Sequence, residues 1–268
     1  MSSSMLKKRK TIENIKQKKN PIICLTAYTK PIAQIVDDFA DIILVGDSVG
    51  PVLYGYKTTR EVSIDIMINH GKAVVSSTNK AFIVIDMPFG TYEYSKEKAF
   101  NNAKKIIDET GANAIKLEGG GKKIAETVKY LVSKNILVVG HLGGLPQSIK
   151  EGESFKIYGR KDKEKKQINK DLTLLEDAGV SAIVIESTIG SLAKQISEKS
   201  KIPTIGIGAS RFCSGQILVT EDIIGLSNFD AKFLKKFCDL NKIIRNAVKL
   251  FADDVRKKKY PQTFHEYK

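Results

Sequence analysis

The stretch DIILVGDS, residues 41–48, joins an apolar strand-like run to polar side chains at its end. Its first half is continuous in Ile, Leu and Val, which is typical of a parallel strand covered on both faces rather than of an alternating, half-exposed strand. The run then ends in Asp47 and Ser48, a carboxylate and a hydroxyl. Both properties recur along the chain, and together they predict the fold and the position of a functional site.

Apolar runs of strand length alternate with amphipathic segments along most of the chain. The expected strands lie at residues 21–28, 41–48, 81–89, 114–120, 137–143, 182–188 and 203–210, with an eighth at 216–226 that could instead begin a helix. The expected helices lie at residues 30–40, 60–77, 95–112, 122–135, 163–180 and 189–201. Gly111 and Gly179 stand just past two of these helices, where a left-handed cap favours glycine.

This alternation predicts a (β/α)8 TIM-type barrel with extra C-terminal helices. An open doubly wound sheet is the alternative, but it would normally carry a glycine-rich fingerprint after its first strand, and LTAYTKP contains none. We expect a basic N-terminal segment, 1–20, followed by a single barrel domain, 21–268. Its helical segment 230–260 could cap the barrel or help assemble subunits. The polar segment 149–165 is predicted to be an active-site loop or lid.

The composition is that of a soluble globular protein, with 42% hydrophobic and 28% charged residues in 268. No apolar run approaches the roughly 18 residues of a membrane span, and the N-terminus lacks the apolar region of a secretory signal. The three cysteines are far apart and form no zinc or disulfide pattern, so we expect a cytoplasmic protein. The net charge of +14 admits nucleic-acid binding, but the lysines are spread along the chain, and we expect no nucleic-acid partner.

Ionisable side chains stand at the ends of five consecutive expected strands. In a (β/α)8 barrel, the carboxyl ends of the strands meet at one rim, where active sites lie. A single strand-end carboxylate often only caps the next helix, but five such groups in order are difficult to explain by capping alone. In chain order, the polar residues at these strand ends are Asp47 with Ser48, Asp86, Lys116 with Glu118, His141, and Glu186.

Asp47, Asp86 and Glu118 come from adjacent expected strands and offer the oxygen ligands that Mg2+ prefers. Zinc or copper is disfavoured, because no cysteine and only one histidine stand at this rim. The alternative is that the three acids pair with Lys116 or with rim amides. Lys116 faces the same side of its strand as Glu118 and is expected to hold a substrate carboxylate. Schiff-base chemistry suits it less well, because three neighbouring acids would keep its ammonium protonated.

His141 and Glu186 complete the expected site. His141 is a candidate hydrogen-bond donor to a developing oxyanion, and a structural role between loops is the alternative. Glu186 ends an apolar run away from the three acids and is the candidate general base, although pairing with a basic neighbour would also explain it. A divalent cation, a carboxylate-binding lysine and a separate base suit the enolisation of a 2-oxo acid, after which the enolate attacks an electrophile.

The motifs that contain these residues resemble those of the ketopantoate hydroxymethyltransferase family. The similar stretches run from about Leu25 to Lys236 and include ILVGDSVG, DMPFGTY, AIKLEGG, VVGHLGGLPQS, IVIES and PTIGIGA. The resemblance implies transfer of a hydroxymethyl group from 5,10-methylenetetrahydrofolate to 3-methyl-2-oxobutanoate. The product would be 2-dehydropantoate, formed in the first step of pantothenate biosynthesis.

The resemblance also implies roles for individual residues and an assembly. One Mg2+ per subunit would lie near the three acids, and Glu186 would be the catalytic base. Substrate contacts would come from Asp47, Ser48, Asp86, Lys116 and His141. The resemblance further implies a homo-oligomer, typically a decamer, with the C-terminal segment helping assembly. A second enzyme class, the phosphoenolpyruvate mutases and isocitrate lyases, usually carries a K-[KR]-C-G-H catalytic loop, which this sequence lacks.

Overall fold

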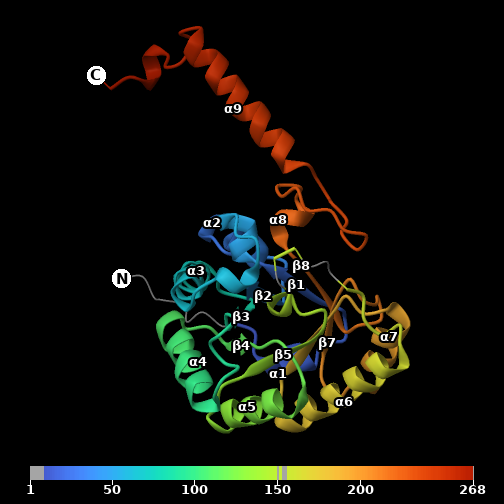
Figure 1. The fold of residues 1–268 in the computed structure, drawn as a ribbon. Coiled ribbons are helices and arrows are strands. Elements are labelled where there is room, and N and C mark those ends of the chain that lie inside the picture. The colour runs from blue at the N-terminus through green and yellow to red at the C-terminus, as the bar shows by residue number, and fades with distance from the viewer. Residues whose placement is uncertain (1–8, 150, 153–155, 268) are drawn as a thin grey trace. The chain divides into compact units, whose positions relative to one another are not determined.

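The computed structural model describes residues 9–149, 151–152 and 156–267, and its central feature is a closed barrel of parallel strands (Figure 1). The strands follow one another around the barrel in chain order, and the last pairs with the first. They are β1 (Ile22–Thr26), β2 (Ile42–Val45), β3 (Phe82–Asp86), β4 (Ala114–Lys116), β5 (Val138–Gly143), β6 (Ala182–Glu186), β7 (Thr204–Ile207) and β8 (Gly215–Leu218). The predicted (β/α)8 barrel is confirmed, and the open doubly wound sheet is excluded.

Helices occupy the connections between the strands and surround the barrel (Figure 1). They are α2 (Lys30–Asp37), α3 (Ile64–Ser77), α4 (Lys96–Thr110), α5 (Gly121–Ser133), α6 (Asp162–Ala178) and α7 (Gly190–Lys199), and α1 (Ile12–Lys16) precedes the first strand. Short helical turns follow β2 and β5, at η1 (Gly50–Tyr54), η2 (Thr59–Glu61) and η3 (Pro146–Ser148). The chain beyond β8 contains α8 (Thr220–Ile223), α9 (Leu240–Arg256) and η4 (Thr263–His265).

Most predicted elements lie within a few residues of their observed positions. Gly111 and Gly179 cap their helices as predicted, with φ angles of 74° and 95°. The apolar run 216–226 contains most of β8 and all of α8, because Thr220 and the acidic residues after it are suited to a helix N-terminus. The predicted loop 149–165 lies partly outside the described residues, and its last residues belong to α6.

The predicted C-terminal helical segment, 230–260, contains a regular helix that is shorter than expected. This helix, α9, begins at Leu240 because Asp239 caps it, accepting a hydrogen bond from the Lys242 backbone N–H at 3.0 Å. The chain divides into two compact units after Val219, and α9 belongs to the second of them. None of the helices in the described ranges has the length and apolar character needed to cross a membrane.

Alternation along the strands produces two apolar layers. In β3, Val84 packs inside the barrel, whereas Ile83 and Ile85 pack outward against the helices. The inner layer includes Cys24, Leu44, Val84, Ala114, Val139 and Val184, one from each of the first six strands. Because side chains alternate with a period of two, the residue two positions further along each strand also faces the barrel interior, nearer its carboxyl end.

The amino end of the barrel is closed by α1. Ile12 and Ile15 are buried in the inner apolar layer. Lys10 Nζ lies 2.8 Å from Asp41 Oδ1, and Lys18 pairs with the other oxygen of the same carboxylate, which stands just before β2. The described part of the basic N-terminal segment is therefore built into the barrel.

Candidate active site

Four strands place a titratable side chain directly above the inner apolar layer. Each stands two residues beyond an inner apolar residue, so alternation turns it into the barrel. These side chains are Asp86 of β3, Lys116 of β4, His141 of β5 and Glu186 of β6. The equivalent position after β2 is Gly46, where a Cβ atom would lie 2.7 Å from Ser48 Oγ and 3.5 Å from Asp86 Oδ2. The glycine therefore leaves room for these two polar side chains.

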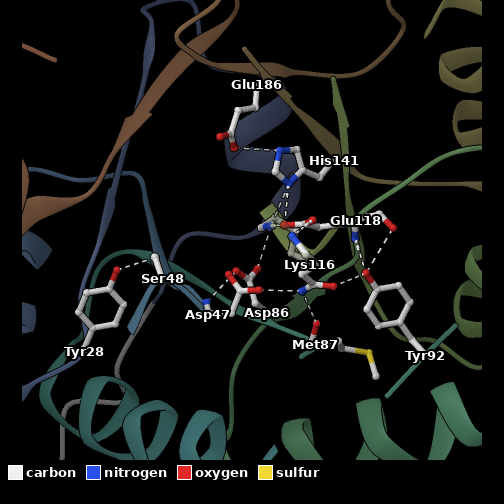
Figure 2. Close-up of polar contacts among 11 residues, drawn as sticks. Tyr28, Asp47, Ser48, Asp86, Met87, Tyr92, Lys116, Glu118, His141 and Glu186 are labelled. Atoms are coloured by element: carbon white, nitrogen blue, oxygen red, sulfur yellow. Dashed lines mark hydrogen bonds and ion pairs between the residues drawn. The ribbon is translucent and has the colours of Figure 1, made fainter. Parts of the chain in front are cut away.

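Asp47, Asp86 and Glu118 gather near the ammonium group of Lys116 (Figure 2). Lys116 Nζ lies 3.1 Å from Asp86 Oδ1 and 4.0 Å from Glu118 Oε1. The backbone N–H of Asp47 donates to Asp86 Oδ2 at 3.0 Å. All four side chains are buried. Asp86 and Glu118 therefore pair with Lys116, which is the alternative to a metal site that the sequence offered. One ammonium group, however, cannot neutralise three carboxylates.

This acid cluster, defined as Asp47, Asp86, Glu118 and Lys116, has strongly shifted pKa values. Burial, followed by the charges of the other two acids, raises the pKa of Asp47 well above its ordinary range. Burial also raises the pKa of Asp86, and Lys116 opposes this shift. Burial lowers the pKa of Lys116, but the three carboxylates outweigh it and the net shift is upward. Lys116 therefore stays protonated, as the sequence predicts.

His141 connects the acid cluster to Glu186 (Figure 2). Its Nδ1 lies 3.4 Å from Glu118 Oε1 and 3.2 Å from Lys116 Nζ, and its Nε2 lies 3.1 Å from Glu186 Oε2. Burial and Lys116 lower the pKa of the imidazole, but the contacts with the two carboxylates outweigh them and raise it to about 9. The two carboxylates therefore favour the protonated form of His141, whereas the Lys116 ammonium beside Nδ1 opposes it. Glu186 thus contacts a basic neighbour in the structure, which is the alternative to a general-base role that the sequence offered.

Full ionisation would leave the site with more negative than positive charge, although burial favours the protonated form of Asp47. When all groups are ionised, four carboxylates face the two cations Lys116 and His141, which leaves an excess of two negative charges. Asp86 Oδ1 is buried and accepts no hydrogen bond, and its contact is the ion pair with Lys116. Hard oxygen donors with excess negative charge suit a divalent cation such as Mg2+. Across the residues described, however, no three His, Cys, Asp or Glu side chains are arranged as a metal-binding group.

Two neutral residues of the site, Gln147 and Tyr92, were not predicted. Gln147 Nε2 donates to Asp47 Oδ2 at 2.8 Å, and Tyr92 Oη donates to Gln147 Oε1 at 2.6 Å. Tyr92 lies in a loop and Gln147 in the short helical turn η3, and neither carries a charge, so a search for ionisable strand ends overlooks them. The available signal was their place in the stretches DMPFGTY and VVGHLGGLPQS, which otherwise contain predicted site residues.

Ser48 lies at the edge of the acid cluster and is half-buried. Its Oγ is 2.7 Å from the hydroxyl of Tyr28, a residue that the sequence did not mark as part of the site (Figure 2). The structure thus brings all the predicted residues to one end of the barrel: Asp47, Ser48, Asp86, Lys116, Glu118, His141 and Glu186. Their individual roles remain predictions.

The sequence is similar to one enzyme family along almost its whole length. Residues 7–263 match the family model described as Ketopantoate hydroxymethyltransferase. The chain is 46% identical to the 3-methyl-2-oxobutanoate hydroxymethyltransferase of Rhizobium etli, over 100% of this chain and 99% of that protein. It is 49% identical to the protein of the same name from Pelagibacter ubique, over 97% of this chain and 99% of that protein.

Solved structures with a similar fold include phosphonopyruvate hydrolase in complex with oxalate and Mg2+. It has a TM-score of 0.59 and 11% identity, covering 89% of this chain and 83% of that one. A 2,3-dimethylmalate lyase, from the PEP mutase/isocitrate lyase superfamily, has a TM-score of 0.57 and 11% identity. The match covers 94% of this chain and 84% of that one. At this level of identity, both structures support the barrel fold alone.

Proposed function

Because the chain belongs to the ketopantoate hydroxymethyltransferase family and is an enzyme of that family, we propose that it transfers a hydroxymethyl group from 5,10-methylenetetrahydrofolate to 3-methyl-2-oxobutanoate. The product is 2-dehydropantoate, made in the first step of pantothenate biosynthesis. The observation that carries the proposal is the buried acid cluster, with Glu186 held outside it by His141.

In this proposal, Asp47, Asp86 and Glu118 hold one Mg2+ per subunit. The excess of negative charge and the oxygen donor set support the assignment. When bound, the cation supplies positive charge that polarises the 2-oxo group and stabilises negative charge on its oxygen.

Lys116 binds the carboxylate of the 2-oxo acid. The upward shift of its pKa keeps the ammonium charged, so it attracts an anion and is a poor nucleophile. Ser48 and Asp86 border the same space around Gly46 and are assigned to substrate contact, as is Asp47. His141, whose pKa the two carboxylates raise to about 9, donates to oxygen as negative charge develops.

Glu186 removes the proton from the carbon next to the keto group. Its Oε2 contacts His141, and we assign proton transfer to the second oxygen, Oε1. The electron pair left on carbon then forms a bond to the one-carbon unit of the folate. Both carbon–nitrogen bonds of that one-carbon unit break, and water supplies the hydroxyl oxygen of the product. Tetrahydrofolate leaves with the proton taken by Glu186 and one proton from water on its two nitrogens.

We expect the purified protein to form 2-dehydropantoate only when metal, folate and 3-methyl-2-oxobutanoate are all present. Omitting Mg2+ and adding EDTA should lower the rate at least about 100-fold, since a catalytic cation contributes several kcal/mol. Product formation is measured by mass spectrometry, with each component omitted in turn.

The same assay separates the alternative, a lyase or mutase with the same barrel. A panel of 2-oxo acids is incubated without folate. Folate-independent consumption of a 2-oxo acid would contradict the assigned donor, and full activity in EDTA would contradict the assigned metal. We propose that its ligands are small molecules, with no nucleic-acid or membrane partner. We also propose a cytoplasmic location, where the free thiols of Cys24, Cys213 and Cys238 remain reduced.

We further propose that the chain forms a homo-oligomer, a decamer in the assembly implied by the family, through α9. This helix has no buried residue and exposes a row of large apolar side chains. Ile243, Val248, Leu250 and Phe251 are each 58–61% exposed. An amphipathic helix with its apolar face uncovered is typical of a subunit interface, because burial of that face stabilises association.

Replacing Phe251 by lysine should therefore shift the protein to a smaller species. The charge disrupts apolar packing at the centre of the helix face, whereas Asn246→Lys introduces the same side chain at an exposed position on another side of α9. Mass photometry measures the species present for both variants. An unchanged mass in Phe251→Lys, or an equal loss in Asn246→Lys, would contradict the assignment of α9.

A further inference from the structure

Gln147 makes four hydrogen bonds at the acid cluster. Its side-chain Nε2 donates to Asp47 Oδ2 at 2.8 Å and to the Met87 carbonyl at 3.0 Å, and its backbone N–H donates to Glu118 Oε2 at 3.0 Å. Its Oε1 accepts from the Tyr92 hydroxyl at 2.6 Å. The residue is 3% exposed, so water has little access to these groups. Both amide hydrogens have acceptors, which fixes the orientation of the side chain.

Tyr92 determines which way the amide of Gln147 points. The Glu118 backbone N–H donates to Tyr92 Oη at 3.2 Å, which leaves the single hydroxyl hydrogen for Gln147 Oε1. The other acceptor within reach, the Glu118 carbonyl, is further away at 3.3 Å. Burial raises the pKa of the phenol, so the hydroxyl keeps its proton. A flipped amide would direct its oxygen at the Asp47 carboxylate and lose its donors to Asp47 and Met87.

Gln147 thereby engages one oxygen of each of two carboxylates that come from different strand ends. It holds Oδ2 of Asp47 and Oε2 of Glu118. The second oxygen of Glu118, Oε1, then faces Lys116 and His141. A single residue of η3 therefore contacts two carboxylates of the cluster, Asp47 after β2 and Glu118 after β4.

We propose that Gln147, oriented by Tyr92, is a positioning residue that directs Asp47 and Glu118 toward a divalent cation. The identity of the cation rests on the proposed function, but the orientation of the two carboxylates can be tested with metal alone. Hydrogen bonds to metal-binding carboxylates orient them and tune their affinity, and removing such a partner typically weakens binding about 10- to 100-fold.

The test is a titration of the metal-free enzyme with Mn2+, followed by electron paramagnetic resonance in the absence of substrate. Gln147→Met keeps the size of the side chain and the backbone bond to Glu118, but it removes both side-chain donors. We expect its Kd for Mn2+ to rise about 10- to 100-fold. Tyr92→Phe keeps the donors but frees the amide to rotate, so a smaller rise is expected.

Gln167→Met is the matched control. Gln167 lies on α6 and donates from Nε2 to Asp171 Oδ1 at 2.8 Å, the same length as the bond from Gln147 to Asp47. Gln167 is exposed and far in sequence from the acid cluster. Its variant should bind Mn2+ with wild-type affinity.

Thermal unfolding of the metal-free variants separates positioning from a purely structural role. A structural role lowers Tm but leaves the Kd unchanged at temperatures well below Tm. If Gln147→Met binds Mn2+ as tightly as the wild type does, the proposal is overturned, even if the wild-type enzyme makes 2-dehydropantoate. The proposal is also overturned if the wild-type enzyme binds no Mn2+. If Gln147→Met does not fold, Tyr92→Phe decides by the same criterion. Weakened Mn2+ binding in an enzyme that makes no 2-dehydropantoate would support the positioning role and contradict the proposed function.

Discussion

Replacing Glu186 by glutamine should lower kcat for 2-dehydropantoate formation by about 100- to 10,000-fold, the range that a general base contributes. The amide keeps the size of the side chain and an oxygen that can contact His141. In the wild type, Glu186 Oε2 lies 3.1 Å from His141 Nε2. It cannot accept the proton from the substrate carbon. Because Glu186 contacts His141 rather than the acid cluster, the affinity for Mn2+ should stay close to that of the wild type.

Two measurements test this result. Steady-state kinetics at saturating substrate give kcat, and exchange of the substrate hydrogen with D2O, followed by NMR without folate, tests proton removal by itself. Glu198→Gln is the control, because Glu198 is an exposed glutamate of α7 that lies 3.7 Å from Lys194. A Glu186→Gln enzyme that keeps more than about a tenth of the wild-type kcat would assign the base to another group.

Replacing Asp86 by asparagine should weaken Mn2+ binding and lower kcat/KM by more than about 100-fold. A bound cation stabilises developing charge by several kcal/mol, and each 1.36 kcal/mol is about tenfold in rate. Asp86 is 2% exposed, and its Oδ1 faces Lys116 at 3.1 Å. Asparagine can keep an oxygen for the Asp47 backbone N–H, but it removes one negative charge from the cluster.

Mn2+ titration and steady-state kinetics measure the two effects separately. Asp108→Asn is the control, because Asp108 is an exposed residue of α4 that pairs with Lys104 one turn away. An Asp86→Asn enzyme with wild-type Mn2+ affinity would remove Asp86 from the set of metal ligands. If kcat/KM is unchanged at a metal concentration below the raised Kd, the cation has no part in the reaction.

The barrel was predictable because its strands are buried on both faces and therefore appear as continuous apolar runs. The prediction is weakest at 216–226, where the apolar residues of β8 continue into those of α8 and periodicity alone does not mark the boundary. The role of α1 could not be inferred from its own residues. Ile12 and Ile15 stand among lysines and are buried only because the closed barrel offers them an apolar end.

The charged residues of the site were predictable for a similar reason. Parallel strands bring their carboxyl ends to one rim, so Asp86, Lys116 and His141 meet even though they are distant in the sequence. Gln147 and Tyr92 could not be identified in this way. Each is neutral and lies outside the strands, and its significance depends on hydrogen bonds to partners that only the folded chain brings near.

The inner apolar layer and α1 together have a consequence for how molecules reach the reacting groups. The barrel below Asp86 and Lys116 is filled with aliphatic and aromatic side chains, and Ile12 and Ile15 close its amino end. Within the described residues this packing closes the amino end, so we expect dissolved molecules to enter and leave at the carboxyl ends of the strands. Substrates and products must use this route in succession, and a product that stays bound excludes the next substrate. Turnover can then be no faster than the departure of product from the carboxyl end of the barrel.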